Sequence, residues 1–391
     1  MFGIAIYRFF YATQGEQEIS MAALENTVYA MSKVFAMRLE KDLALQSQVA
    51  NLWALDKDIT RAKFRQFIMS PAFEPALQTM SGMSLIPYVL NADRAAFEAR
   101  AETQDLLEAC CNSTVYDNTA SACRDKAATL CELGRYSILE SVNGSLAPSP
   151  AQDAYVVVDY IEPFESNAGV LGFNLASSAT RKEAWEQAVD TGLAVFTRRI
   201  QLVQSNTKEF AFLVWKAVFE GEVEGTFAFK EESPTSVPRG SVNGVYKAQQ
   251  FLSGAMAIFG TSELANLDIF LFDTLAPAGQ QFLAVYSESL GDPLTLATTF
   301  EEYTPEDIVG EFGTIQRTIN ISGADAEMML VVRPNEAFFR EKASDAPQNL
   351  LIWSMLLILA SQAERHLGYL AAIANRARML NVQAISKRLS S

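Results

Sequence analysis

Near its middle the chain reads Tyr155-Val-Val-Val-Asp159-Tyr-Ile-Glu162-Pro163, followed by Gly172-Phe-Asn174-Leu-Ala-Ser177. Residues 155–161 are mostly β-branched and aromatic, which predicts a strand. A helix is predicted for 179–194, and the strongly apolar run 209–219 predicts another strand. Strands mixed with a few helices indicate the α+β class.

Residues 16–56, upstream of this stretch, contain neither Gly nor Pro. Apolar residues recur there at steps of three and four, at Leu24, Val28, Met31, Phe35, Leu39 and Leu43. This spacing predicts an amphipathic helix of about 40 residues, roughly 60 Å long. Globular domains rarely need such a helix, so residues 1–57 are expected to form a stalk. The alternative is two ordinary helices that break near Lys41. The apolar start 2–7 fits either the end of a membrane helix whose first part is absent or an ordinary helix start.

The rest of the chain divides into two predicted α/β units, at 58–240 and 241–345. The first has further predicted helices at 58–67 and 93–107 and a strand at 85–90. The second has a predicted helix at 247–259 and strands at 267–273, 281–286, 314–321 and 327–332. Both are expected to contain sheets of the PAS type. Between them, 221–240 is predicted as a loop with a short strand at 226–229, because Gly, Pro, Ser and charged residues fill it.

All four cysteines fall in 108–150, which is predicted as an irregular polar insertion: Cys110, Cys111, Cys123 and Cys131. Such clustering is typical of an oxidising compartment. Neighbouring Cys110 and Cys111 are poor partners for each other, so each is expected to bond Cys123 or Cys131, which leaves two connectivities. Four free thiols and a zinc site are the alternatives, although no Cys-x-x-Cys pair supports zinc. Sequons at Asn112, Asn143 and Asn320 are compatible with glycosylation on a secretory route.

The net charge of −15 is unevenly distributed. Residues 362–391 carry five Lys or Arg against one Glu, a net of +4, so the other 361 residues carry −19. An acidic chain repels phosphate backbones, so nucleic acid is not an expected partner. The uncharged segment 346–363 precedes the basic tail, as positive-inside topology produces. We therefore expect a membrane span at 346–363 and a basic cytoplasmic signalling helix at 364–391. The alternative is a buried core helix, because the apolar heart 350–360 is shorter than the ~20 residues of a full span.

Most catalytic motifs are missing from the sequence. His366 is the only histidine and lies in the basic tail, so Ser-His-Asp and Cys-His chemistry and histidine-ligated metal are excluded from the acidic part. No Gly-rich phosphate-binding motif occurs. We expect no enzyme activity, no cofactor and no metal. The sequence does not exclude carboxylate chemistry of the glycosidase type, but nothing in it selects a catalytic pair among the 46 acidic residues.

The order of motifs resembles the CHASE domain, the extracellular sensory module of membrane receptors that end in histidine kinases or nucleotide cyclases. The resemblance covers roughly residues 16–339. It is carried by the long helix, Ile86-Pro87-Tyr-Val89, Arg94, Phe97-Glu98, the Tyr155–Pro163 strand, Gly172–Ser177, Asp190-Thr-Gly192, Thr197 and the apolar strand. Leu85 replaces the Trp of the family pattern, Asn174 replaces an Asp, and Lys216-Ala217 stands where Pro is frequent.

The resemblance implies a pocket in the first, membrane-distal unit. Candidate ligand contacts are Tyr155, Val157, Asp159, Phe173, Arg181, Thr197, Phe212 and Trp215. Alternation sends Phe212 to one face of its strand and Trp215 to the other. In relatives that bind cytokinins, an acidic side chain near the start of the 179–194 helix meets the adenine. Arg181-Lys182 stands there in this chain, which disfavours a purine and favours an anionic or carbonyl-bearing ligand.

These features together predict a small-molecule sensor at the cell membrane, with most of the chain extracellular. A ligand would change how the distal unit sits on the stalk, and the change would pass inward to an output domain that this chain lacks. A homodimer through the stalk is expected. The alternatives are a secreted or lumenal carboxylate-dependent hydrolase and an adhesion ectodomain without a small ligand.

Overall fold

The computed structural model describes residues 2–103, 130, 133, 135–142, 144–203, 209–219, 238–259, 264–310, 313–321, 324–335 and 337–338. The chain divides into two compact units, one at 27–335 and one that combines 1–26 with 336–391. Of the second unit, helical residues at 2–26 are the main described part. All contacts discussed below lie within 27–335.

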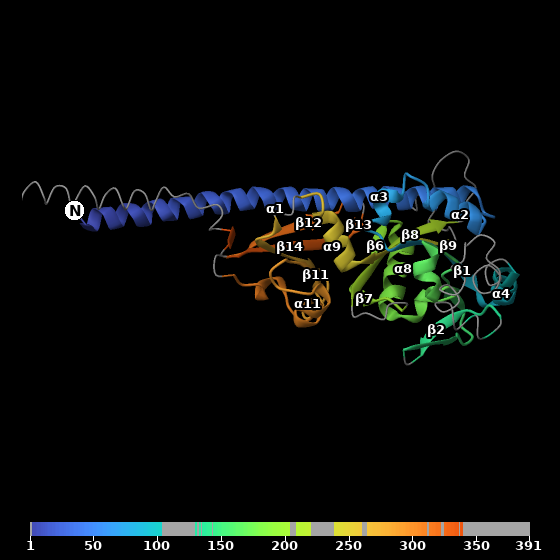
Figure 1. The fold of residues 1–391 in the computed structure, drawn as a ribbon. Helices are drawn as coiled ribbons and strands as arrows, with labels where there is room; N and C mark the ends of the chain where they lie inside the picture. The colour runs from blue at the N-terminus through green and yellow to red at the C-terminus, as the bar shows by residue number, and fades with distance from the viewer. Residues whose placement is uncertain are drawn as a thin grey trace, which may run out of the picture. The chain divides into compact units, whose positions relative to one another are not determined.

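Helix α1 (Phe2–Leu55) confirms the predicted long N-terminal helix and continues without a break at Lys41. Its predicted apolar stripe is buried, because Val28, Met31, Phe35 and Leu39 have no exposed surface. The helix also includes residues 2–15, for which the spacing of apolar residues made no prediction. The α+β class is likewise confirmed by the two main sheets that follow (Figure 1).

The large sheet has the strand order β13-β6-β8-β9-β1-β4, with β5 paired to β1 and β7 paired to β8. Its strands are β1 (Gly82–Leu90), β4 (Ala154–Val156), β5 (Tyr160–Glu162), β6 (Ala194–Phe196), β7 (Ile200–Gln201), β8 (Phe210–Phe219), β9 (Pro238–Lys247) and β13 (Ala324–Asp325). The antiparallel pair β8 and β9 forms its centre, in a register that places Leu213 opposite Val245 and Trp215 opposite Asn243.

Helices cover both faces of this centre. Helix α8 (Ala179–Thr191) buries Ala184, Trp185 and Ala188 against the face that carries Leu213 and Trp215. The opposite face carries aromatic residues that meet α1 and α9 (Ala248–Met256), as the ring contacts of Phe251 with Phe35, Phe212 and Tyr246 demonstrate. Strands β8 and β9 are therefore buried on both faces, which explains why every residue of β8 except Lys216 is apolar.

The small sheet has the order β11-β10-β14-β12. Its strands are β10 (Leu267–Asp273), β11 (Phe282–Tyr286), β12 (Ile315–Asn320) and β14 (Glu327–Pro334), and α11 (Pro293–Thr299) accompanies them. Phe270, Phe272, Phe282 and Phe300 form its aromatic core. The short strand β13 lies between β12 and β14 in sequence but pairs in parallel with β6 of the large sheet.

Smaller elements complete the large-sheet region. They are α2 (Arg61–Ile68), α3 (Glu74–Leu77), η1 (Asn91–Asp93), α4 (Arg94–Ala101), the hairpin β2 (Leu139–Val142) and β3 (Ser145–Pro148), α7 (Phe164–Asn167), η3 (Ala168–Val170) and η4 (Leu175–Ser177). A short 3-10 helix, η6 (Pro305–Asp307), belongs to the small-sheet region.

Several sequence expectations for these elements were wrong. The strand expected over 155–161 is interrupted, because Val157 to Asp159 separate β4 from β5. The end of the segment expected to be irregular forms the β2–β3 hairpin. The loop expected up to Gly240 ends earlier, since β9 begins at Pro238 and runs through residues 241–246, for which no strand was expected. The short strands β6 and β7 and helix α11 were also not predicted.

Gly240 explains why β9 has the composition of a turn. A Cβ atom at this position would lie 2.2 Å from the carbonyl oxygen of Ile86 and 2.8 Å from the Trp53 ring. Glycine is therefore needed for β9 to pair closely with β1 beneath α1. Its presence indicates close packing here rather than a turn.

Some predicted features lie outside the described residues. They are Cys110, Cys111, Cys123, Cys131, Asn112, Asn143, the short strand at 226–229, the segment 346–363 and the basic tail 364–391. The remaining sequon residue, Asn320, is exposed at the end of β12. Among the residues that the structure describes, no helix combines the length and the apolar character that a membrane crossing requires.

Candidate functional site

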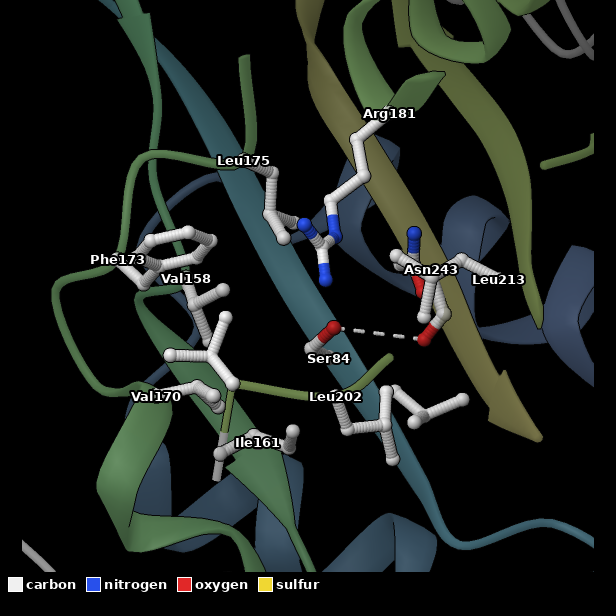
Figure 2. Close-up of a pocket in the computed structure, with 12 residues that line it drawn as sticks. Ser84, Val158, Ile161, Val170, Phe173, Leu175, Arg181, Leu202, Leu213 and Asn243 are labelled. Atoms are coloured by element: carbon white, nitrogen blue, oxygen red, sulfur yellow. Dashed lines mark hydrogen bonds between the residues drawn. The ribbon is translucent and has the colours of Figure 1, made fainter. Parts of the chain in front are cut away.

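A small cavity of about 30 Å³ lies between the large sheet and the segment that leads into α8 (Figure 2). This volume holds roughly two water molecules. The lining residues are Ser84, Val158, Ile161, Val170, Phe173, Leu175, Arg181, Leu202, Val203, Leu213, Asn243 and Val245. Nine of them are apolar, so the three polar side chains determine the chemistry of the site.

Arg181 reaches into this cavity from the first turn of α8 (Figure 2). The residue is only 8% exposed, and burial lowers the pKa of its guanidinium to about 10. It therefore remains protonated at neutral pH. Nη2 donates a hydrogen bond to the Gln201 carbonyl oxygen at 2.8 Å, and the guanidinium lies 5.8 Å from the centre of the Phe173 ring.

The positive charge of Arg181 lacks a counter-ion at the cavity. None of the described residues that line the cavity is acidic, and within the described ranges Arg181 forms no ion pair and its Nε has no hydrogen-bond partner. An isolated buried charge is strongly unfavourable unless a partner of opposite sign compensates it. The site is therefore suited to an anion.

Asn243 and Ser84 provide the neutral polar groups of the cavity. They face each other on neighbouring strands β9 and β1. Asn243 is 1% exposed, and in the described part of the chain neither its Oδ1 nor its Nδ2 has a hydrogen-bond partner. Ser84 Oγ donates a long hydrogen bond of 3.4 Å to the Asn243 carbonyl oxygen. Because buried polar groups are normally hydrogen-bonded, the unpaired amide indicates space for a ligand or water.

Two of the predicted ligand residues, Phe173 and Arg181, line this cavity. Trp215 lies in the same apolar core but is not among the lining residues. Lys182, which the sequence placed beside Arg181 as a second cation, is exposed and forms an ion pair with Glu186 at 3.7 Å. Only one cation of the Arg-Lys pair is therefore available to a ligand here.

Tyr155 and Val157 lie away from this cavity and pack against Val89 and Ile138 in a separate cluster. The Tyr155 hydroxyl accepts hydrogen bonds from the Gln152 N–H and from Arg94, each at 3.0 Å. Val158, between β4 and β5, lines the cavity instead. Ligand contact by Tyr155 and Val157 stays a prediction, which their packing does not support.

Thr197 and Phe212 also lie apart from the Arg181 cavity. Thr197 Oγ1 accepts a hydrogen bond from the Leu213 N–H at 2.9 Å, which fixes β6 against β8. Phe212 stacks on Tyr246 with ring centres 5.0 Å apart, on the side of the sheet that faces α9. Both line a different space of only about 10 Å³. Their contact with a ligand likewise stays a prediction.

Asp159 borders a larger cavity of about 270 Å³ near the C-terminal end of α1. Its walls include Trp53, Phe97 and Tyr160. Asp159 forms a 2.7 Å ion pair with Arg100. Lys57, Asp58 and Arg239 line this cavity as well, so its wall carries charges of both signs, whereas the described wall of the Arg181 cavity carries only a cation.

Ser84 and Asn243 are site residues that sequence reasoning missed. No strand was predicted for residues 241–246, so the position of Asn243 in a central strand was not recognised. The available signal was alternation: Val242, Gly244 and Tyr246 occupy one face, and Asn243 and Val245 the other. A polar residue on the buried face of an apolar strand is a recognisable indication of a site.

Helix α1 is attached to the two strands whose opposite face lines the cavity. Gln46 on α1 is 1% exposed, and its Nε2 donates to the carbonyl oxygens of Val214 at 2.7 Å and Val242 at 2.8 Å. Val242 directly precedes the cavity residue Asn243, and Val214 directly follows the cavity residue Leu213. A shift of either strand would therefore act on α1 directly.

Asp42 lies one turn before Gln46 on the same buried face of α1. Thr79 Oγ1 donates to Asp42 Oδ2 at 3.3 Å, and Arg38 Nε lies 3.9 Å from Oδ1. Burial raises the pKa of the Asp42 carboxyl to about 7, although Arg38, Thr79, Lys41 and Tyr246 all act to lower it. The attachment of α1 therefore contains a group that titrates near neutral pH. In the described part, no cluster of His, Cys, Asp and Glu side chains could hold a metal ion.

Comparisons with known proteins relate this geometry to a family. A sequence model described as the CHASE domain matches residues 57–283, more than half of the chain. No curated protein sequence matches. Among solved structures, the ligand-binding domain of the Pseudomonas aeruginosa PAO1 amino acid chemoreceptor PctC in complex with GABA is similar at 12% identity and a TM-score of 0.39, covering 80% of this chain and 98% of that one.

Two further structures are similar at the same low level. The ligand-binding domain of the Pseudomonas fluorescens chemoreceptor CtaA in complex with L-isoleucine has 12% identity and a TM-score of 0.38, covering 83% of this chain and 98% of that one. An extracellular ligand-binding receptor from Desulfohalobium retbaense has 14% identity and a TM-score of 0.28, covering 62% and 36%. The family match and the cavity therefore support the function of this chain, and these structural similarities do not.

Proposed function

Because the chain belongs to the CHASE domain family, we propose that it is the extracellular sensing module of a transmembrane receptor and that its ligand binds in the cavity beside Arg181. The match of residues 57–283 includes every residue that lines this cavity. Binding of the ligand would be passed to a cytoplasmic output domain outside this chain.

One observation supports the choice of this cavity above the others. Within the described residues it combines a buried guanidinium that has no carboxylate partner with an amide side chain that has no hydrogen-bond partner. Ligand sites are typically apolar pockets with a few placed polar groups, and buried polar groups without partners are unfavourable unless a ligand or water satisfies them. A ligand that pairs with both groups would remove that cost.

The proposed signal travels across the large sheet. A ligand held by α8 on one side and by Leu213 and Asn243 on the other would favour one spacing of β8 and β9. Gln46 binds the carbonyl oxygens of both strands on the opposite face, so that spacing biases the position of α1. Such coupling requires only that the ligand binds one arrangement better than the other.

The remaining parts of the proposal follow the sequence expectations. Residues 58–240 and 241–345 would form distal and membrane-proximal PAS-like units. The segments 346–363 and 364–391 would be a membrane span and a cytoplasmic signalling helix, and two copies would associate through the stalk. Disulfides among Cys110, Cys111, Cys123 and Cys131 and glycans on Asn112, Asn143 and Asn320 would fit the extracellular location.

A thermal-shift screen of the purified full chain against a metabolite library tests the proposal. A ligand at 100 times its dissociation constant adds about 2.7 kcal/mol to stability, which is readily detected. Val203→Phe should remove the response by filling the rim of the cavity, whereas Phe97→Leu, which changes the wall of the larger cavity, should retain it. A response that survives Val203→Phe but is lost in Phe97→Leu would relocate the site and contradict the proposal.

A further inference from the structure

We infer that the ligand of the Arg181 cavity is a small monocarboxylate with an apolar body, and that zwitterionic amino acids, amines and dianions are rejected. This inference rests on the proposed sensing function and specifies the ligand class for it. It depends on the charge of the cavity, the arrangement of its polar groups and its size.

The charge of the cavity selects a monoanion. Among the described residues that line it, Arg181 is the only charged one. One carboxylate would neutralise this charge, and charge-assisted hydrogen bonds to a guanidinium are among the strongest polar contacts in proteins. A dianion would leave one negative charge buried without a partner, and so a phosphate monoester is a poorer fit than a carboxylate.

The described part of the cavity lining contains no acidic side chain, which disfavours amino acids and amines. The ammonium group of an α-amino acid would enter the cavity without a carboxylate from these residues to pair with it. The carboxylate of that amino acid would neutralise Arg181, but the ammonium would then stand as a second buried cation. Burying such a charge without a partner is strongly unfavourable.

The polar atoms are placed to hold one end of the ligand. Arg181 Nε has no hydrogen-bond partner within the described residues, and the neighbouring Nη2 is held in place by the Gln201 carbonyl. In Figure 2 the guanidinium points toward Ser84 and Asn243. Asn243 offers both a donor and an acceptor, so a hydroxyl or keto group next to the carboxylate would fit as well.

The apolar walls determine the other end of the ligand. Val158, Ile161, Val170, Leu202 and Val245 leave no polar partner for a second charged or strongly polar group. The volume of about 30 Å³ means that any ligand larger than a few atoms must widen the cavity as it binds. A short branched or linear alkyl chain is the body that meets both conditions.

The experiment compares four compounds that share a branched carbon skeleton: isovalerate, valine, isoamylamine and isoamyl alcohol. Binding to the purified full chain is measured by calorimetry and thermal shift. Acetate, propionate, butyrate and the hydroxy and keto derivatives of isovalerate extend the carboxylate series. We expect carboxylates to bind, with valine and isoamylamine at least about 10-fold weaker than isovalerate, because each of them places an unpaired ammonium group in the cavity.

Variants assign the effect to the guanidinium. Arg181→Gln should weaken the best carboxylate by on the order of 10- to 100-fold, and Arg181→Lys should restore part of the affinity. Lys182→Gln is the matched control, because Lys182 is the adjacent but exposed cation of the same helix turn, and it should bind like the unmodified protein. Circular dichroism of each variant verifies that the fold is retained.

Three results would contradict the inference. Binding of valine or isoamylamine as tightly as isovalerate rejects the charge argument, as does carboxylate binding that Arg181→Gln leaves unchanged. No response to any carboxylate in the series also rejects it. If Val203→Phe abolishes binding of a different library compound but Arg181→Gln leaves that binding unchanged, the inferred ligand class is wrong while the proposed sensing site stands. If neither substitution changes the binding of any compound that binds, the proposed site itself is wrong.

Discussion

Arg181 illustrates how a binding residue can lower the stability of the unliganded protein. Its guanidinium is buried beside Phe173, with one hydrogen bond to Gln201 and no acidic neighbour in the cavity lining. We expect Arg181→Met to raise the free energy of unfolding by about 1–3 kcal/mol, because an apolar side chain of similar length removes the buried charge. Urea unfolding without ligand measures the change.

The matched control for this prediction is Arg199→Met. Arg199 also has its pKa lowered by burial, but it donates hydrogen bonds to the carbonyl oxygens of Glu301 at 2.7 Å and Phe282 at 3.2 Å. Removing it should lower stability, since its carbonyl partners would be left unpaired. Equal losses of stability at both positions would show that Arg181 is a structural residue rather than one kept for a ligand.

Asp42 makes a distinct prediction about pH. Burial raises its pKa from 3.8 to about 7 in the folded protein, so between these values the folded state holds a proton that the unfolded state releases. The stability that Asp42 contributes should therefore be greatest at acidic pH and fall as the pH rises from about 4 to about 7. Asp42→Asn should remove this part of the pH dependence and raise stability by up to about 4 kcal/mol at pH 8.

Denaturant unfolding of both proteins across this pH range measures the difference. Glu162, whose pKa burial also raises to about 7, contributes a slope of the same sign in both proteins. The comparison must therefore use the difference between the two curves rather than the slope of one. Parallel curves for the two proteins would show that Asp42 does not titrate near neutral pH.

At the scale of elements, the attachment of α1 to β8 and β9 is the connection on which the proposed signalling depends. Gln46→Ala removes both hydrogen bonds to the strand carbonyls, and the expected loss of stability is about 1–3 kcal/mol. Ligand binding in this variant should no longer slow hydrogen exchange in α1, while the cavity still binds. Gln48→Ala, two residues along on the exposed side of α1, should change neither property.

Exchange measured by mass spectrometry distinguishes coupling from simple stabilisation. If α1 in the Gln46→Ala variant still responds to ligand like the unmodified protein, the signal does not pass through this contact. Loss of ligand binding itself would also contradict the account, because Gln46 lies on the opposite face of the sheet from the cavity.

Gly240 tests the packing of β9 beneath α1. Gly240→Ala should lower stability by several kcal/mol or prevent folding, since the added methyl group would overlap the Ile86 carbonyl oxygen at 2.2 Å. Gly279→Ala is the control, because Gly279 has a φ of 78° but no atom within 4 Å of the added carbon. Its expected cost is about 1 kcal/mol from backbone strain alone. Similar thermal unfolding of the two variants would contradict the packing argument.

Elements with a strong periodic pattern could be predicted from the sequence. Helix α1 was predictable because its apolar stripe recurs at helical spacing and because 16–56 contains no helix breaker. Strand β8 was predictable because both of its faces are buried. Strand β9 was not, because its glycines and Asn243 are present for close packing and for the cavity, and these residue types are most common in turns.

The candidate site was predictable only in part for the same reason. Phe173 and Arg181 were found through the family resemblance, which places them beside the helix that covers the pocket. The run Val156-Val-Val158 carries no alternation of polar and apolar residues, so the sequence did not indicate that Val158, rather than Tyr155 or Val157, lines the Arg181 cavity. Ser84 and Asn243 meet only through strand pairing, which the sequence of either strand alone does not contain.

At the scale of the whole unit 27–335, the large sheet separates two different environments. One face lines the Arg181 cavity, and the other carries the aromatic and polar contacts with α1 and α9. A ligand and the long helix thus share the same two strands without touching each other. In the proposed function, this arrangement would let the chain report a small molecule by a change in α1.

Hydrogen exchange of the purified full chain, with and without a saturating small monocarboxylate, tests this central claim most directly. The account predicts slower exchange in α8, in β8 and β9 around Leu213 and Asn243, and in α1 between residues 38 and 50, with no such change in Arg181→Gln. Unchanged exchange in β8, β9 and α1 on ligand binding, or protection confined to the small sheet, would contradict it.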